Sequence, residues 1–416
     1  MDDQPKLTGF GKLVALVVIG GCLAGAAVLF LRGPWSASKS NASANGDAAT
    51  GSSSGSATGR VQERAPTTGD LVEIGIAYGS EKHTWFTWAV PEFAKTEAGR
   101  KIKINLKKMG SIEGAQAVLK EDKSINVWSP ASRLYEHTLV DEWKLRRGGD
   151  SPIIKGELLA LTPMVYVMWE ERFKEFDKKF APEGGLNFRT IEKAFQAKGG
   201  WNDIAGKPEW GFFKFGHTHP QQSNSGLMTL ILMAYDYHNK TTNLTMSDIT
   251  DPKFQTWATS LQRGVTGLSN STDNMMVEMV QRGPSTYDAL FVYENTAIDR
   301  LESARDRSGR VRVVYPEKNA WNDNPYYVLN VPWSDKKQQA AAQAFLDFLM
   351  SEPAQQRALV HGFRPGNVNV SISGPDSPFT KYQEYGVRLQ LPTVCDLPSG
   401  EVIQNLLIRW QQTRGG

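Results

Sequence analysis

The chain has 416 residues, a formal net charge of +3, 40% hydrophobic residues and 22% charged residues. This balance excludes an intrinsically disordered chain, which carries fewer apolar residues and a larger net charge. It also excludes a disulfide-stapled scaffold, since the sequence holds only Cys22 and Cys395, and a nucleic-acid-binding protein, which concentrates positive charge. A globular protein of two or so domains remains, at ~150 residues per domain.

The first 68 residues differ from the rest. Residues 13–31 contain no charged side chain, and a membrane span needs roughly 17–25 apolar residues. We expect residues 1–35 to hold a cytoplasmic stub and a single transmembrane anchor in the cell (inner) membrane, with the remainder on the extracytoplasmic side. Two alternatives stay open, a secretory signal cleaved near residues 36–38 and a lipid attached at Cys22. Residues 36–68 are mostly Ser, Ala, Gly, Asn and Thr without periodicity, which predicts a flexible tether.

From Leu71 onward, short apolar runs alternate with helical stretches. Strands are predicted over Leu71–Tyr78, Lys101–Leu106, Ile125–Trp128, Met164–Trp169, Trp210–Phe215, Asp288–Tyr293 and Tyr326–Val331. Helices are predicted through Ala115 and Val118, through Leu134 and Leu139, over Gly226–Tyr237, through Met276 and Val280, and over Gln338–Met350, Pro353–Val360 and Glu401–Trp410. This alternation predicts an α/β architecture with mainly parallel sheets. About 350 residues exceed what one hydrophobic core usually supports, so we expect two lobes.

Small polar residues follow the predicted strands. Ser80, Ser111 and Ser129 follow the first three strands, Ser223–Gly226 precedes a strongly apolar helix, and Ser271–Asn274 opens another. In parallel α/β sheets, ligands collect at the carboxyl ends of strands, where helix N-termini direct free N–H groups into the crevice. Hydroxyls and amides in these positions can bind an anion or a polar solute, although the same residue types are also the ordinary N-caps of helices.

Signatures of enzymes are scarce. No Gly-x-x-x-x-Gly-Lys-[Ser/Thr] loop is present, which argues against a nucleoside triphosphate site. His217 and His219 supply two of the ligands that a metal-dependent hydrolase would need, and this remains one alternative. Tyr326-Tyr327 resembles the paired tyrosines that hold ferric iron in some transport proteins, but alternate packing within a strand explains the pair as well. We expect a protein that is not an enzyme and carries no cofactor.

The residues after the tether resemble a bacterial extracellular solute-binding protein of the type II periplasmic-binding fold, in the branch with molybdate and sulfate receptors. The similarity covers about Leu71 to Trp410, and it also extends to solute-binding modules that occur beside von Willebrand factor A domains. Its most specific parts are Ser223-Asn224-Ser225-Gly226, Ala289-Leu290-Phe291-Val292-Tyr293-Glu294, Gly362-Phe363-Arg364-Pro365, and Leu397-Pro398-Ser399-Gly400-Glu401-Val402 before the last helix.

This resemblance implies two lobes that close over one solute and deliver it to an ABC-type permease. Crossovers between the lobes are expected near Pro163–Met168 and Pro325–Val331. The corresponding divisions are 69–165 for the first part of lobe 1, 166–325 for lobe 2, and 326–416 for the return of lobe 1 with the C-terminal helix. From the strand ends and the resemblance together, the candidate ligand-binding residues are Ser80, Ser111, Ser129, Ser223, Asn224, Ser225, Asn274 and Tyr293.

Three charged residues depart from the family pattern. Glu81 and Lys82 follow Ser80 directly, and Glu294 follows Tyr293. A carboxylate in a desolvated cleft would repel an oxyanion by several kcal/mol, so the solute is either an oxyanion or another small polar molecule. A further alternative is a sensor or scaffold of the same fold that docks a membrane partner instead of serving transport. No nucleic-acid partner is expected.

Overall fold

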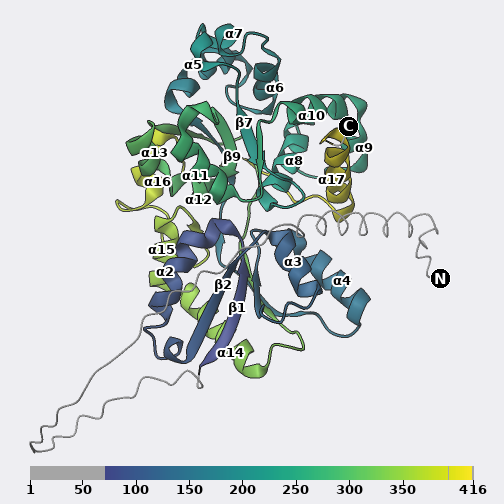
Figure 1. The fold of residues 1–416 in the computed structure, drawn as a ribbon, viewed down its shortest axis with the longest axis vertical. Helices are drawn as coiled ribbons and strands as arrows, with labels where there is room; N and C mark the ends of the chain where they lie inside the picture. Colours follow the sequence, from purple (N-terminus) through teal and green to yellow (C-terminus); the bar gives the residue numbers. More distant parts are fainter. Residues whose placement is uncertain (1–70, 392, 415–416) are drawn as a thin grey trace, which may run out of the picture. The chain divides into compact units, whose positions relative to one another are not determined.

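The computed structural model describes residues 71–391 and 393–414. The anchor and the tether predicted over residues 1–68 lie outside these described residues. Within the described ranges, no helix combines the length and the apolar character needed to cross a membrane. The described residues form two lobes, each built on a five-stranded sheet with helices on both faces (Figure 1). The predicted two-lobed α/β architecture is therefore confirmed.

The first lobe contains the sheet β2-β1-β3-β12-β4. Its strands are β1 (Val72–Tyr78), β2 (Ile102–Lys108), β3 (Val127–Ser129), β4 (Ile153–Leu158) and β12 (Pro325–Leu329). Strand β1 pairs in parallel with β2 and β3, whereas β12 runs antiparallel to β3 and β4. The helices are α2 (His83–Phe93), α3 (Ser111–Leu119), α4 (Glu136–Arg147), α14 (Lys336–Leu349) and α15 (Glu352–Val360).

The second lobe contains the sheet β10-β6-β9-β7-β8. Its strands are β6 (Met164–Trp169), β7 (Phe215–Thr218), β8 (Gly267–Ser269), β9 (Ala289–Tyr293) and β10 (Val311–Val314). Strand β7 is parallel to β8 and β9, and β6 is antiparallel to β9 and β10. The helices are α5 (Glu170–Phe180), α6 (Phe188–Gln196), α7 (Trp201–Ala205), α8 (Asn224–Tyr237), α9 (Met246–Thr250), α10 (Pro252–Gly264), α11 (Thr272–Arg282), α12 (Glu294–Ile298), α13 (Leu301–Arg307), α16 (Pro378–Lys381) and α17 (Gly400–Arg414).

Both sheets are mixed: four strands in each share one direction, and one strand, β12 in the first lobe and β6 in the second, runs against them. The expectation of mainly parallel sheets holds for the four strands and did not include the fifth. The cause is the path of the chain between the lobes. Strands β6 and β12 are the first strands that the chain forms after each crossing, and they start at the edge where their neighbours end: Met164 pairs with Tyr293, and Pro325 pairs with Leu158. A strand that enters from the hinge must therefore run against the others.

The strand predicted over Trp210–Phe215 is also wrong in its position. Strand β7 begins only at Phe215, because Gly211 has a φ of +69° and turns the chain, and Phe212 is 67% exposed. The strand is buried at all of its positions although it contains polar residues such as His217, and a search for apolar runs does not detect such a strand. This shift places the end of β7 at Thr218, close to the start of α8.

The cores explain why these runs form strands and helices. Strand β6, with the sequence MVYVMW, is buried at every position because helices cover both faces of its sheet. In the first lobe, Ile74 and Ile76 of β1 pack with Phe86 of α2 and Phe345 of α14. Each such side chain stabilises the fold by about 1.5–3 kcal/mol when it is fully buried. The loops at the end of this sheet are therefore attached to stable strands and helices.

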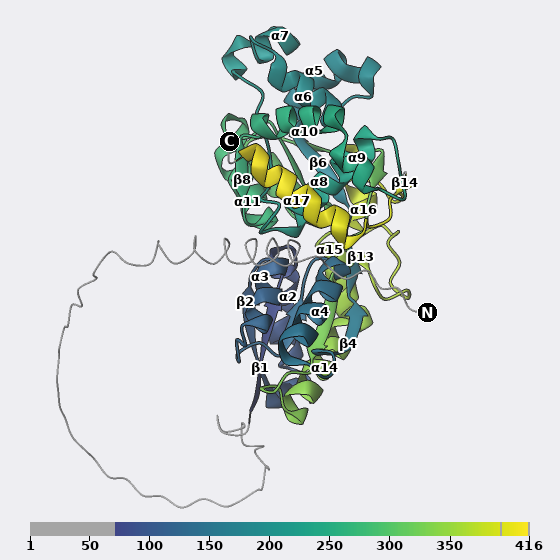
Figure 2. The same cartoon turned by 90° about the vertical axis from the view of Figure 1, so that its right-hand side faces the viewer.

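The C-terminal helix α17 lies against α8, α9 and α10 of the second lobe (Figure 2). Leu406 and Trp410 are buried there, and Trp410 Nε1 donates to Gln262 Oε1 over 2.9 Å. The domain division made from the sequence grouped residues 326–416 with lobe 1. The packing of α17 places the end of this segment with the second lobe instead, which means that the chain crosses between the lobes a third time.

Short strand pairs connect the crossing segments. β5 (Ala160–Leu161) pairs with β13 (Arg364–Pro365), and β11 (Lys318–Asn319) pairs with β14 (Thr393–Val394). A bridge between Thr162 and Asn322 joins the first two crossings directly. The three crossings are therefore hydrogen-bonded to one another along the hinge.

Candidate solute-binding site

A cavity of about 180 Å³ lies between the two lobes. At roughly 30 Å³ per water molecule in the liquid, it has the volume of about six waters. The first lobe lines it with Gly79, Ser80, Glu81, Lys108, Met109, Gly110, Ser111 and Glu113. The second lobe lines it with Ser223, Asn224, Asn270, Ser271, Thr272, Asn274 and Tyr293. The lining comes from the segments that follow β1, β2, β7, β8 and β9, as the topology of an α/β sheet requires.

Helices begin at this cavity from both lobes. In the first lobe these are the 3₁₀ turn Ser80–Lys82, which leads into α2, and α3, which begins at Ser111. In the second lobe they are α8 and α11, whose N-caps are Ser223 and Ser271. The first N–H groups of a helix have no partner within the helix, and they carry the positive end of its dipole. Their convergence favours a ligand that is negatively charged or rich in hydrogen-bond acceptors.

The segment Ser223–Gly226 holds α8 against the sheet. Ser225 Oγ lies 2.5 Å from Thr218 Oγ1 and 2.6 Å from Thr272 Oγ1, so one hydroxyl joins the end of β7 to the starts of α8 and α11. A Cβ on Gly226 would lie 2.3 Å from the Thr218 carbonyl oxygen, which only glycine permits. The hydroxyl of Ser225 is therefore used for structure, while Ser223 and Asn224 line the cavity.

Tyr293 forms part of the floor and is 1% exposed. Its hydroxyl oxygen accepts a hydrogen bond of 2.9 Å from Asn224 Nδ2, and Ser225 is a second side-chain hydrogen-bond partner of the hydroxyl. Burial raises the pKa of Tyr293 well above its usual value, and the charge of Glu81 acts in the same direction. The group therefore stays a neutral hydrogen-bond donor at physiological pH.

A buried ion pair adjoins the cavity in the first lobe. Lys82 Nζ donates to Glu81 Oε1 over 2.5 Å, to the Pro130 carbonyl over 3.1 Å and to Asn324 Oδ1 over 3.0 Å. Burial lowers the pKa of Lys82, although the neighbouring charge of Glu81 favours the ammonium form. The three partners use all three N–H groups of the ammonium, so this cation holds Glu81 in place and leaves no proton for a solute.

The two lobes touch across the cavity. A Cβ built on Gly110 of the first lobe would lie 2.5 Å from the carbonyl oxygen of Gln222 in the second. Asn295 Nδ2 donates to the Glu81 carbonyl over 3.0 Å, and Thr84 Oγ1 donates to Asp299 Oδ2 over 3.0 Å. These contacts bring the two lobes together beside the cavity, which corresponds to a closed arrangement.

Six of the eight candidate residues line the cavity, namely Ser80, Ser111, Ser223, Asn224, Asn274 and Tyr293. Ser129 and Ser225 do not. Ser129 is fully buried and its hydroxyl donates to the Pro325 carbonyl over 2.8 Å, because β3 lies beside the crossing strand β12. Glu294 also points away from the cavity: it pairs with Arg364, whose Nε and Nη2 lie 2.8 and 2.7 Å from its two oxygens.

Several lining residues were not among the candidates. Asn270 and Thr272 follow β8, a three-residue strand that the apolar pattern did not reveal. Lys108 and Glu113 flank the turn before α3 and are exposed. Glu81 was noted only as a departure from the family pattern. Its position directly after a cavity-lining serine is the one signal in the sequence that pointed to it.

The histidines considered as metal ligands and the tyrosine pair considered as an iron site all have structural contacts. His217 is fully buried, with Nδ1 2.7 Å from the Thr218 carbonyl oxygen and Nε2 3.1 Å from Gln262 Oε1, while His219 packs against the Trp410 ring. Both ring nitrogens of His217 therefore have protein partners. Tyr326 and Tyr327 lie on opposite faces of β12, where their hydroxyls donate to the Ala342 carbonyl and to Glu136. Neither tyrosine lines the cavity.

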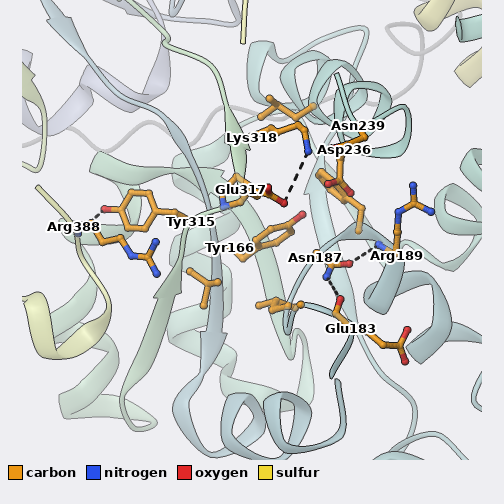
Figure 3. Close-up of a pocket in the computed structure, with 16 residues that line it drawn as sticks. Tyr166, Glu183, Asn187, Arg189, Asp236, Asn239, Tyr315, Glu317, Lys318 and Arg388 are labelled. Atoms are coloured by element: carbon orange, nitrogen blue, oxygen red, sulfur yellow. Dashed lines mark hydrogen bonds and ion pairs between the residues drawn. The ribbon is translucent and has the colours of Figure 1, made fainter. Parts of the chain in front are cut away.

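A larger cavity of about 510 Å³ lies in the second lobe (Figure 3). Its lining includes Tyr166, Asp236, Lys318, Arg189 and Arg388. No part of its lining comes from the first lobe. Since a ligand there would contact only the second lobe, its binding would not favour closure of the two lobes.

The sequence was compared with models of protein families and with curated proteins. The sequence model of a family described as "Bacterial extracellular solute-binding protein" matches residues 74–364. A comparison of the sequence with curated proteins found no match.

Solved structures of binding proteins share the fold of this chain. The sulfate-binding protein SubI from Mycobacterium tuberculosis H37Rv superimposes with a TM-score of 0.52 at 16% identity, over 80% of this chain and 95% of that one. Iron-bound HitA from Pseudomonas aeruginosa gives 0.51 at 14% identity, over 82% and 99% of the two chains. The ferric binding protein from Campylobacter jejuni gives 0.52 at 11% identity, over 82% and 97%. At these identities the likeness establishes the fold alone.

Proposed function

Because the chain belongs to the bacterial extracellular solute-binding protein family, we propose that it captures a small polar solute or oxyanion in the cavity between its lobes. Capture proceeds by closure of the hinge, and the closed protein presents the solute to the permease of an ABC-type transporter. A solute that contacts both lobes stabilises the closed state, since it binds that state better than the open one.

One observation carries this proposal. Helix N-termini from both lobes meet at one small cavity, and the lobes touch over it at Gly110 and Gln222. Donors on one lobe alone would bind an anion without closing the hinge. Donors on both lobes link capture to closure, as a receptor for a transporter requires.

Solute binding is expected to raise the melting temperature of the purified protein. At a free solute concentration of 100 times Kd, binding adds about 2.7 kcal/mol, which corresponds to a rise of about 5 °C for a protein of this size. The panel contains oxyanions, ferric and divalent metal ions, sugars and amino acids, and differential scanning fluorimetry provides the measurement.

Matched variants identify the cavity as the binding site. Ser80→Ala and Tyr293→Phe remove hydroxyls that line it, so they should reduce the thermal response to the solute. Ser129→Ala removes a hydroxyl of the same kind at a strand end that turns away from the cavity, and it should leave the response intact. If no member of the panel raises the melting temperature, the proposal fails.

We further propose that residues 13–31 anchor the protein in the cell membrane, with both lobes on the extracytoplasmic side. The support is the uncharged apolar sequence of this segment. Full-length protein in isolated membranes should stay in the pellet after washing with alkaline carbonate. Loss of membrane binding in Cys22→Ser would indicate a lipid anchor instead, and a mature chain that starts after residue 36 would indicate a cleaved signal.

A further inference from the structure

Asn224 presents a hydrogen-bond acceptor beside the cavity. The orientation of its amide follows from its neighbour: Asn322 Nδ2 donates to the Thr162 carbonyl over 3.1 Å, so Asn322 Oδ1 is the acceptor of the bond from Asn224 Nδ2. Asn224 Nδ2 also donates to Tyr293. Asn224 is 2% exposed, and its Oδ1 has no hydrogen-bond partner among the described residues.

Glu81 adds a second acceptor on the opposite lobe. Its Oε1 accepts from Lys82, while its Oε2 has no hydrogen-bond partner in the described part of the chain. Glu81 lines the cavity and is 6% exposed. Because all three protons of the Lys82 ammonium are already used, the carboxylate keeps both its acceptor capacity and its influence on the charge of a ligand.

The cavity therefore favours a ligand that carries both hydrogen-bond acceptors and a hydrogen-bond donor. The helix N-termini favour a ligand with acceptors, as an oxyanion provides. Asn224 Oδ1 favours a donor, because a buried acceptor is costly when it stays unpaired, and the Glu81 carboxylate lines the cavity as a second acceptor. An oxyanion without a proton meets the first demand and is repelled by Glu81 at the second.

We propose that the solute is a small tetrahedral oxyanion that keeps a proton at neutral pH, which is the chemistry of hydrogen phosphate. Its three proton-free oxygens face the helix N-termini, and its hydroxyl donates to Glu81 or to Asn224. Fully ionised oxyanions such as sulfate have no proton to offer and are rejected. This inference rests on the proposed function, because it names the class of solute for the same cavity.

Pairs of anions that match in size and differ in their proton provide the test. Phosphate and sulfate form one pair, and arsenate and selenate form another. Isothermal titration calorimetry of the unmodified protein at pH 7 should show inorganic phosphate and arsenate binding at least 100-fold more tightly than sulfate and selenate. Equal or tighter binding of sulfate, selenate or molybdate, or tight binding of glycine as a zwitterion, would overturn the inference while the receptor function stands. Failure of every solute in the thermal panel removes the receptor function itself.

Variants then locate the discriminating group. Glu81→Gln should weaken phosphate binding at least tenfold and narrow the ratio of phosphate to sulfate affinity. Since this change leaves Lys82 without its counter-ion, Glu81→Gln with Lys82→Met provides a second variant in which the charge pair is removed together. Glu97→Gln removes an exposed carboxylate that does not line the cavity and should change both affinities less than threefold. If both Glu81 variants keep the full ratio of phosphate to sulfate affinity, Glu81 does not select for the protonated anion.

Discussion

Replacement of Gly110 by leucine is expected to weaken solute binding by 100-fold or more and to leave the fold intact. Gly110 has φ −65° and ψ 155°, a conformation that any residue adopts, so leucine adds no backbone strain. Its Cβ, however, would lie 2.5 Å from the Gln222 carbonyl of the other lobe. Because this carbonyl oxygen belongs to the backbone and cannot move aside, the leucine side chain would hold the two lobes apart. Because closure contributes the contacts of the second lobe, an open protein retains only part of the binding free energy.

Two measurements test this expectation. Calorimetry gives the affinity for the solute that produces the largest thermal shift, and small-angle X-ray scattering shows whether that solute still compacts the protein. Gly374→Leu is the control, since a Cβ at Gly374 meets no atom within 4 Å. Undiminished affinity in Gly110→Leu would mean that binding does not require the lobes to touch at this point.

Loss of Arg364 is expected to destabilise the fold strongly. Arg364 donates to both oxygens of Glu294 and to the carbonyls of Arg388 and Leu389, and the Tyr315 hydroxyl also donates to Glu294. Burial raises the pKa of Glu294, which the arginine opposes. Arg364→Met leaves this buried carboxylate without its counter-ion, a change that costs about 3–5 kcal/mol in comparable pairs.

Denaturation by urea gives the free energy of unfolding for this comparison. Arg305→Met provides the matched control, because Arg305 pairs with Asp306 on the surface with both side chains at least half exposed. Exposed pairs contribute about 0–1 kcal/mol. The double variant Arg364→Met with Glu294→Gln should recover part of the loss, since no unpaired charge stays buried. A loss below 1 kcal/mol for Arg364→Met would contradict the argument.

The fold was predictable wherever apolar runs were long. Strand β6 has no charged residue and helix α8 has only Asp236, and both lie where the periodicity placed them. Strand β7 was misplaced because its buried positions include His217 and Thr218, whose hydrogen bonds to neighbouring groups substitute for apolar character. The direction of β6 and β12 was not predictable from local pattern, since it depends on where the chain crosses between lobes.

The cavity was predictable from strand ends, but the role of each hydroxyl was not. Ser80 and Ser129 both follow a strand, yet only Ser80 lines the cavity, because β3 adjoins a crossing strand whose carbonyl accepts from Ser129. Glu294 looked like a charge in the cleft until its partner Arg364, 70 residues further along the chain, was located. Pairings over such sequence distances leave no local signal in a single sequence.

The three hydrogen-bonded crossings at the hinge have a mechanical consequence. Two independent connections would let the lobes both bend and twist. Here β5 is paired with β13, and Thr162 forms a bridge with Asn322, so each connection should restrain its neighbour against rotation. We expect the relative motion of the lobes to consist mainly of opening and closing. If the protein captures a solute as proposed, such a hinge should limit the number of misaligned states and thus the orientational entropy that is lost on closure.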